Sequence, residues 1–139
     1  ERLKALGADH LINYKTTTAW GAKTLELTRG VGVDHVVEIG GAGTLDQSII
    51  AARNGGHVAV IGILTGYGGP VSTVVLMAKQ LRVQGLTVGS RKHQFDMIRA
   101  IDVSGIKPVI DRSFPLANLA DAFRYQESNT HFGKIVIDI

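Results

Sequence analysis

Short, continuously apolar runs alternate with helix-length amphipathic segments through most of the chain. Residues 33–39 and 57–63 form two such runs. They are too continuous for half-exposed strands and are typical of strands buried in a parallel sheet. Between them, Leu45, Ile49 and Ala52 share one helical face. This strand–helix–strand order predicts an α/β fold with helices covering a parallel sheet.

The same criteria predict the remaining elements. Helices are expected at residues 3–6, 19–28, 72–80, 95–104 and 118–128, and extended segments at 10–14, 81–88, 108–116 and 134–139. Thr44 and Gln47 have the spacing of a capping box, and Gly55-Gly56 is expected to end the helix that Thr44 opens. The pattern His-Val-x-x-Ile-Gly begins at His35 and again at His57, 22 residues later. That interval accommodates one strand and one crossover helix.

Composition narrows the function classes. The chain has 139 residues, a formal net charge of +3 and 45% hydrophobic residues, which describes an ordinary globular protein of one domain's length. It contains no cysteine, which excludes disulfides, thiolate metal sites and a cysteine nucleophile. No apolar run approaches the roughly 20 residues of a membrane helix. The basic residues form no stripe with interleaved aromatics, so we expect neither a membrane nor a nucleic-acid partner.

Three predicted strand ends are alike and form the candidate binding site. They read Ile39-Gly40-Gly41, Ile61-Gly62-Ile63 and Thr87-Val88-Gly89. Ligands of open parallel sheets bind outside the carboxyl ends of the strands. Each glycine taken alone is explained by the end of a buried strand, but three in series favour a nucleotide crevice.

Other candidate residues support a structural interpretation more than a chemical one. Gly40-Gly41-Ala42-Gly43 resembles part of a phosphate-binding fingerprint but lacks the complete glycine spacing, so we predict a structural turn. Glu38 lies inside a buried strand, where an ionised carboxylate requires partners, so it is expected to accept hydrogen bonds at the rim of the site. The five histidines show no metal-ligand spacing, and no nucleophile motif is present.

The order of motifs resembles the medium-chain dehydrogenase/reductase superfamily, which includes zinc-type alcohol dehydrogenases and quinone oxidoreductases. The matching segments are residues 3–10 (LKALGADH), 32–38 (GVDHVVE), 55–62 (GGHVAVIG), 81–85 (LRVQG) and 132–136 (FGKIV). Each motif is moderately specific, but the series covers essentially the whole chain in the right order.

The resemblance implies the C-terminal portion of such an enzyme. The expected fold is α/β: a partial Rossmann-type, doubly wound parallel sheet without its first two strands. Residues 1–106 would belong to the NAD(P)-binding domain, and residues 107–139 would form a tail whose helix and strand return to a catalytic domain absent from this chain. The strand at residues 10–14 would then lie beside a gap in the sheet.

The parent enzyme would be cytoplasmic and would transfer hydride between NAD or NADP and an alcohol, carbonyl or enone substrate. Zinc would belong, where used, to the absent catalytic domain. No catalytic residue can be carried over, and we expect this chain alone to be inactive.

The resemblance also implies cofactor contacts for individual residues. Ile39 and Gly40, followed by Gly41, would face the adenine side, and Ile61, Gly62 and Ile63 would line the ribose and nicotinamide. Leu86 and Val88 would offer backbone groups to the carboxamide. Lys134 would reach the pyrophosphate, although a lysine that merely opens an exposed strand explains it nearly as well.

Alternatives remain open at this point. The chain could be a catalytically inert fragment that retains the fold and dimerisation, or a doubly wound domain of another class such as a methyltransferase. Whether the dehydrogenase portion binds cofactor or is an inert fragment, residues 81–88 would form an apolar edge strand. Such an edge, with the adjoining segment from residue 71, predicts a homodimer.

Overall fold

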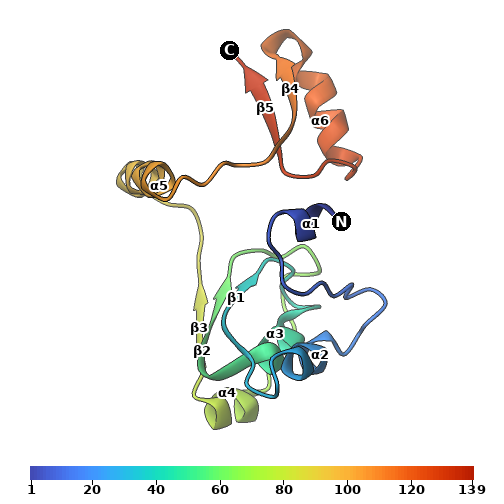
Figure 1. Ribbon diagram of the computed structural model, residues 1–139, viewed down its shortest axis with the longest axis vertical. Coiled ribbons are helices and arrows are strands. Elements are labelled where there is room, and N and C mark those ends of the chain that lie inside the picture. Colours follow the sequence, from blue (N-terminus) through green and yellow to red (C-terminus); the bar gives the residue numbers. More distant parts are fainter. The chain divides into compact units, whose positions relative to one another are not determined.

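Figure 1 shows the computed structural model, which describes residues 1–139 as two units of helices and strands, Glu1–Val88 (unit 1) and Gly89–Ile139 (unit 2). Unit 1 contains α1 (Arg2–Ala5), α2 (Trp20–Leu27), β1 (Val33–Glu38), α3 (Leu45–Ala51), β2 (Ala52–Val60), α4 (Thr73–Lys79) and β3 (Arg82–Gly85). Unit 2 contains α5 (Arg91–Ser104), β4 (Ile110–Pro115), a 3-10 turn (Leu116–Asn118), α6 (Leu119–Glu127) and β5 (Lys134–Asp138).

The sheet of unit 1 is parallel, with the order β1-β2-β3. Val36 pairs with Val58, which pairs with Val83 on the far side, so these three valines point to the same face. The α/β class and the parallel pairing predicted from the apolar runs are therefore confirmed. β3 is an edge strand, as expected.

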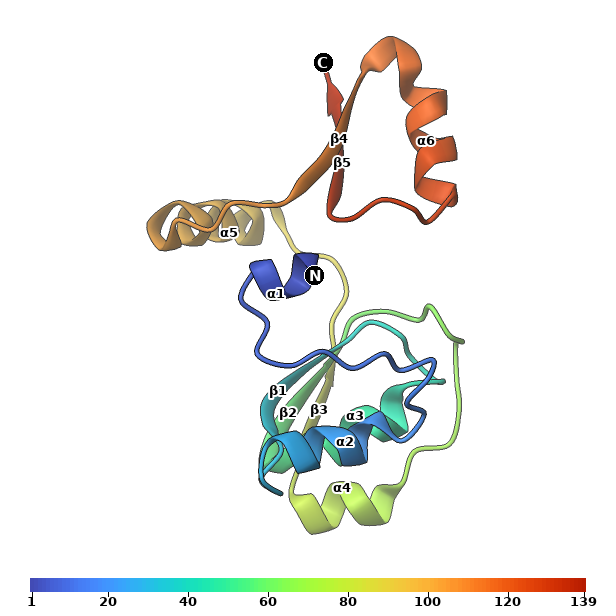
Figure 2. The same cartoon turned by 45° about the vertical axis from the view of Figure 1, so that its right-hand side comes forward.

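Helix α3 packs against β1 and β2 of this sheet, and α2 lies beside α3 (Figure 2). Ile49 of α3 and Val58 of β2 are completely buried and form the centre of the core. Helix α4 is tied to the end of α3 by Lys79, whose Nζ donates to the carbonyls of Ile50 and Ala52, each at 2.6 Å. A cation at a helix C-terminus interacts favourably with its unpaired carbonyls.

Two local expectations were wrong. Residues 10–14 are not a strand, because no strand within the chain pairs with them and an extended segment without a partner forms no ladder. Gly55-Gly56 does not end a helix: α3 stops at Ala51, and the two glycines lie inside β2. Here the backbone of Gly55 takes a positive φ of 69°, which glycine adopts without strain.

Unit 2 is built around a two-stranded parallel sheet of β4 and β5, against which α6 packs. Tyr125 of α6 donates a hydrogen bond to Asp111 of β4 at 2.5 Å, and the Arg112 guanidinium lies 4.3 Å from the Tyr125 ring centre. Helix α5 begins with a capping box between Ser90 and His93. The boundary predicted between the NAD(P)-binding domain (residues 1–106) and the returning tail (residues 107–139) is a functional boundary, and it stays a prediction.

None of the helices is both long and apolar enough to cross a membrane.

Candidate functional site at the carboxyl ends of the strands

The carboxyl ends of β1, β2 and β3 meet at one edge of the sheet in unit 1. The amides of Ile61 and Gly62 donate to the carbonyl of Glu38 at 2.8 and 3.2 Å, and the amide of Leu86 donates to the carbonyl of Val60 at 2.9 Å. These bonds extend the strand ladder past the ends of the strands. The prediction that the strand ends lie together is confirmed for β1 and β2. The third end differs: β3 stops at Gly85 because its pairing with β2 ends there, so Thr87-Val88-Gly89 lies beyond the strand and Gly89 belongs to unit 2.

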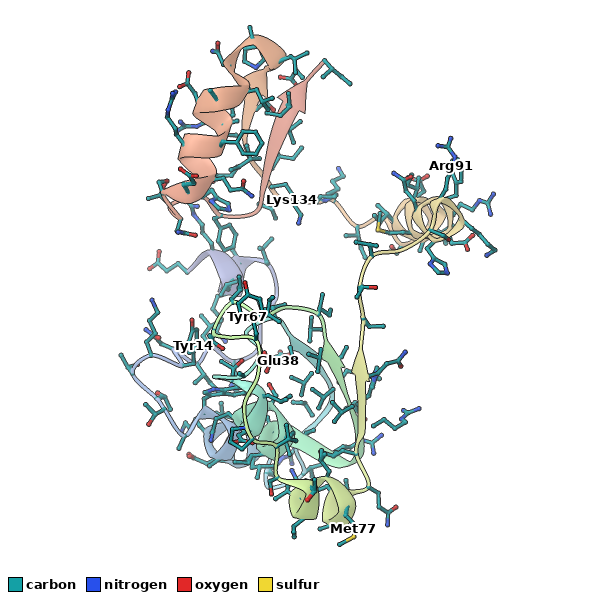
Figure 3. The ribbon with its side chains drawn as sticks, turned by 180° about the vertical axis from the view of Figure 1, so that it is seen from behind. Tyr14, Glu38, Tyr67, Met77, Arg91 and Lys134 are labelled. Carbon is teal, nitrogen blue, oxygen red and sulfur yellow. The ribbon has the colours of Figure 1, made fainter.

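Most of the predicted cofactor-binding residues lie along this edge. Gly40 and Gly41 are buried in the turn, whereas the apolar side chains around them are exposed: Ile39, Ile61, Ile63 and Leu86. Gly62 lies against the backbone of Ile39. Val88, the last residue of unit 1, is almost entirely exposed. Lys134, labelled in Figure 3, is the first residue of β5 in unit 2, whereas the other predicted residues belong to unit 1.

Two of these glycines are required by the geometry of the edge. A Cβ on Gly62 would collide with the carbonyl oxygen of Ile39. Gly41 has φ of +88°, and a Cβ there would also meet the Gly66 carbonyl oxygen at 2.9 Å. The strand ends therefore present bare backbone to each other, and no larger side chain can occupy either position without moving the loops.

Glu38, the last residue of β1, is only 3% exposed, and its buried carboxylate accepts several hydrogen bonds. Its Oε1 accepts from the amides of Gly40 and Gly41 at 2.7 and 2.9 Å and from the Thr44 hydroxyl at 2.6 Å. Its Oε2 accepts from the Ser48 hydroxyl. The expectation that this carboxylate accepts hydrogen bonds at the site is confirmed.

Opposing effects act on the pKa of Glu38. Burial alone would raise it, but the hydrogen bonds from Ser48, Thr44 and the two glycine amides outweigh burial and hold the pKa of the carboxyl below its ordinary value. The group is therefore an anion that is stabilised by donors rather than by a countercharge.

The start of α3 differs from the predicted capping box. The Thr44 hydroxyl donates to Glu38 and caps no helix amide, and the side chain of Gln47 does not turn back toward Thr44. Instead Gln47 accepts from the amide of Gly21 at 2.9 Å and joins α3 to α2. Competition from these two tertiary partners explains why the local motif does not form.

Thr65 connects the loops that follow β1 and β2. Its hydroxyl donates to the Gly40 carbonyl at 2.9 Å and accepts from the Gly43 amide at 2.8 Å, while its own amide donates to the Gly40 carbonyl at 2.7 Å. Sequence reasoning missed this residue, because Thr65 and Gly40 are 25 positions apart and nothing local indicates the contact.

A cavity of about 360 Å³ opens beside the β1 end. Its wall is mainly apolar and includes two aromatic side chains from the N-terminal segment, Tyr14 and Trp20. Tyr14 and Glu38 are both labelled in Figure 3. Two predicted site residues, Ile39 and Gly40, line the cavity. Its lining also includes residues that were not predicted: Thr44, Ser48, Leu64 and Thr65. A flat, largely apolar group fits such a wall.

The histidines take no part in this edge of the sheet. His35 and His57 are register partners inside β1 and β2, three residues before the end of each strand, with their rings edge to face at 5.8 Å. The structure contains no group of three or more histidine, aspartate or glutamate side chains that could hold a metal ion.

Comparison with known proteins adds to this geometry. The zinc-binding dehydrogenase family matches residues 6–137, almost the whole chain. The chain belongs to the zinc-binding dehydrogenase family. The resemblance described from the motifs is therefore confirmed, and the methyltransferase alternative is set aside.

Individual relatives agree with this family. A zinc-type alcohol dehydrogenase-like protein of Schizosaccharomyces pombe is 38% identical over 100% of this chain and 41% of its own length. The solved structure of an NAD-dependent alcohol dehydrogenase is 36% identical, with a TM-score of 0.83 over 99% of this chain and 40% of that one. A 2-haloacrylate reductase structure is 26% identical, with a TM-score of 0.78 over 96% and 44%.

The chain thus spans about 40% of the length of these zinc-binding dehydrogenase relatives. The fold similarity extends to both units.

Proposed function

We propose that the strand-end edge of unit 1 binds a nicotinamide dinucleotide, NAD or NADP, as part of an oxidoreductase. The observation that carries the proposal is the juxtaposition of the three strand ends with the apolar cavity beside Ile39 and Gly40. Ligands bind at this edge in open parallel sheets. The names of the relatives, an NAD-dependent alcohol dehydrogenase among them, support a nicotinamide cofactor.

In this proposal the adenine side lies against Ile39, Gly40 and Gly41. Ile61, Gly62 and Ile63 line the ribose and nicotinamide, and Leu86 and Val88 offer backbone groups to the carboxamide. Lys134 of unit 2 reaches the pyrophosphate. The nicotinamide supplies the hydride chemistry when bound, and the residues of this chain orient it.

The parent reaction proposed is hydride transfer between the nicotinamide and an alcohol, carbonyl or enone. The names of two relatives support the two ends of that range, an alcohol dehydrogenase and a reductase of 2-haloacrylate, an activated alkene. We propose that the 139-residue chain does not perform the reaction by itself, and that zinc, where the parent uses it, is held outside this chain. A cytoplasmic location completes the proposal, and fractionation of cells that express a tagged protein tests it.

Fluorescence tests cofactor binding directly. Trp20, the only tryptophan, lines the cavity. Addition of NADH to the chain should quench the Trp20 emission by energy transfer and increase the nicotinamide emission. Ile39→Asp should abolish both signals, because it places a carboxylate on the apolar wall, and it should not unfold the chain since Ile39 is 56% exposed.

The matched control is Ile106→Asp, at a position in unit 2 that is 61% exposed. This variant should bind NADH as the unmodified chain does. If the unmodified chain gives neither signal at millimolar NADH, the inert-fragment interpretation replaces the proposal. If Ile39→Asp binds NADH normally, the proposed site is wrong.

We also propose a homodimer through residues 81–88. β3 is an edge strand of the sheet, and Val83 on it and Leu86 just after it are partly exposed. Met77 on α4 (Figure 3) adds exposed apolar surface close in sequence. Light scattering should give the mass of a dimer for the unmodified chain and of a monomer for the double variant Val83→Lys/Leu86→Lys. A monomeric unmodified chain at high concentration contradicts this part.

A further inference from the structure

Each backbone amide of the Gly40–Thr44 turn, which lies between β1 and α3, has a partner within unit 1. The amides of Gly40 and Gly41 donate to Glu38 Oε1. The amide of Ala42 donates to the Gly66 carbonyl at 3.5 Å, and that of Gly43 to the Thr65 hydroxyl. The amide of Thr44 donates to the Gly41 carbonyl at 3.0 Å. A turn that binds a phosphate needs such amides free and pointing at the ligand.

The Glu38 carboxylate occupies the place that an external anion would take in such a turn. It receives two amides and two hydroxyls, from Thr44 and Ser48. Hydrogen bonds to an ionised acceptor are stronger than those between neutral groups. A second anion at this turn would meet a negative charge already in place, and it would have to displace bonds that are individually strong.

Thr65 transmits this fixed geometry to the next loop. Its hydroxyl holds the Gly40 carbonyl and the Gly43 amide at opposite ends of the turn. Because Thr65 belongs to the loop after β2, the loop that carries Ile61, Gly62 and Ile63 is joined to the turn that Glu38 fixes.

We infer that Glu38 and Thr65 are positioning residues of the strand-end site: they engage three of the five amides of the Gly40–Thr44 turn, and backbone carbonyls engage the other two, so that this turn faces an uncharged part of the ligand and binds no phosphate. The inference rests on the proposed function for the identity of the ligand. The exclusion of phosphate from the turn rests on the hydrogen bonds alone.

The sharpest variant is Thr65→Val, because it removes the hydroxyl while keeping the shape, at an exposed position where the fold should tolerate the change. The dissociation constant of NADH should rise roughly tenfold, the effect of about one lost hydrogen-bond pair. Thr65→Ser, which restores the hydroxyl, should return affinity to within about twofold of the unmodified chain. Thr18→Val, at another exposed threonine of unit 1, is the matched control and should bind normally.

Affinities are compared below the melting temperature of every variant, so that loss of fold is not mistaken for loss of positioning. A purely structural Thr65 would lower the melting temperature without changing the dissociation constant of the folded protein. Thr65→Val that is folded and binds NADH as the unmodified chain does would overturn the inference. An unmodified chain that does not bind NADH at all would instead contradict the proposed function.

Inorganic phosphate tests the exclusion without NADH. In the unmodified chain, phosphate should leave the NMR signals of the Gly40, Gly41 and Gly43 amides unmoved. In Glu38→Gln, which removes the internal charge, phosphate should shift them. Should Glu38→Gln fail to fold, the unmodified chain still decides the matter: phosphate-dependent shifts of these amides at millimolar concentration would overturn the exclusion.

Discussion

In unit 1 a three-stranded sheet covered by α3, with α2 packed beside α3, buries Ile49 and Val58 completely, whereas in unit 2 one helix against two strands buries only one apolar side chain, Ala122. The polar networks differ in the same way. Unit 1 contains a carboxylate, Glu38, that is enclosed and satisfied by four donors. The central pair of unit 2, Tyr125 and Asp111, lies closer to solvent. A buried anion of this kind requires a scaffold that excludes water and holds its donors, which only the larger sheet supplies.

The largest difference between the units should come from deleting a core side chain. Ile49→Ala in α3 should lower the free energy of unfolding by about 2–5 kcal/mol, since the site is closed on all sides. The same substitution at Ile106 in unit 2 should change it by about 0.5 kcal/mol or less, because that side chain is largely exposed. Urea unfolding followed by circular dichroism compares the two. Equal effects would mean that the two units do not differ in packing as described.

The second-largest loss of stability is expected when the buried carboxylate of Glu38 is neutralised. Glu38→Gln should destabilise unit 1 by about 2–3 kcal/mol, because the amide loses the charge that strengthens these hydrogen bonds and places an NH2 group where Oε2 accepts from Ser48. The control is Glu26→Gln, at a side chain that is 69% exposed, where little change is expected. Thermal unfolding monitored by Trp20 fluorescence reports unit 1. A melting temperature for Glu38→Gln equal to that of the control would contradict the network.

A smaller loss is expected at the junction of α3 and α4. Lys79→Met keeps the length of the side chain but removes the ammonium that donates to Ile49, Ile50 and Ala52. We expect a cost of about 1–2 kcal/mol, typical of a cation at a helix C-terminus with its hydrogen bonds. Lys92→Met on exposed α5 is the comparison in unit 2. If both variants unfold at the same denaturant concentration, the contribution of Lys79 is absent.

Acid should destabilise unit 1 through protonation of Glu38. The donors around Glu38 hold its pKa below the ordinary value, so its stabilising contribution is complete above the ordinary glutamate pKa and is lost as pH falls through the lowered one. The partners facing it, two amides and the hydroxyls of Thr44 and Ser48, do not titrate in this range. Trp20 fluorescence should therefore show acid destabilisation that is weakened in Glu38→Gln. An identical acid profile in the variant would contradict the assignment.

Unit 2 should show the smaller, opposite response in alkali. The hydrogen bond to Asp111, helped by burial and by the charge of Asp111, raises the pKa of the Tyr125 phenol. Its contribution is complete below the ordinary tyrosine pKa and is lost as pH rises through the raised one. An ultraviolet titration should show one tyrosine that ionises late and that is missing in Tyr125→Phe. Asp111→Asn should move the Tyr125 pKa back toward the ordinary tyrosine value, and no movement would contradict the pairing.

The sequence predicted those parts of unit 1 that depend on side-chain type along a single element. The apolar runs at β1 and β2 correctly predicted parallel strands, although β1 is less buried than its run indicates, with Val37 67% exposed. The glycines after these strands predicted the edge that is proposed here to bind the cofactor. It failed where the outcome depends on a distant partner. Residues 10–14 have the composition of a strand but no strand to pair with, and Gln47 bonds to Gly21 instead of completing a cap. Thr65 carried no local signal at all, since its role exists only when two loops meet.

The most direct test of the central claim, that the strand ends of unit 1 bind a nicotinamide dinucleotide, is a backbone amide NMR titration of the unmodified chain with NADH. The account predicts saturable shifts at residues 39–41, 61–65 and 86, with little change in β4 and α6. No saturable shifts, or shifts confined to residues 110–127 of unit 2, would contradict it.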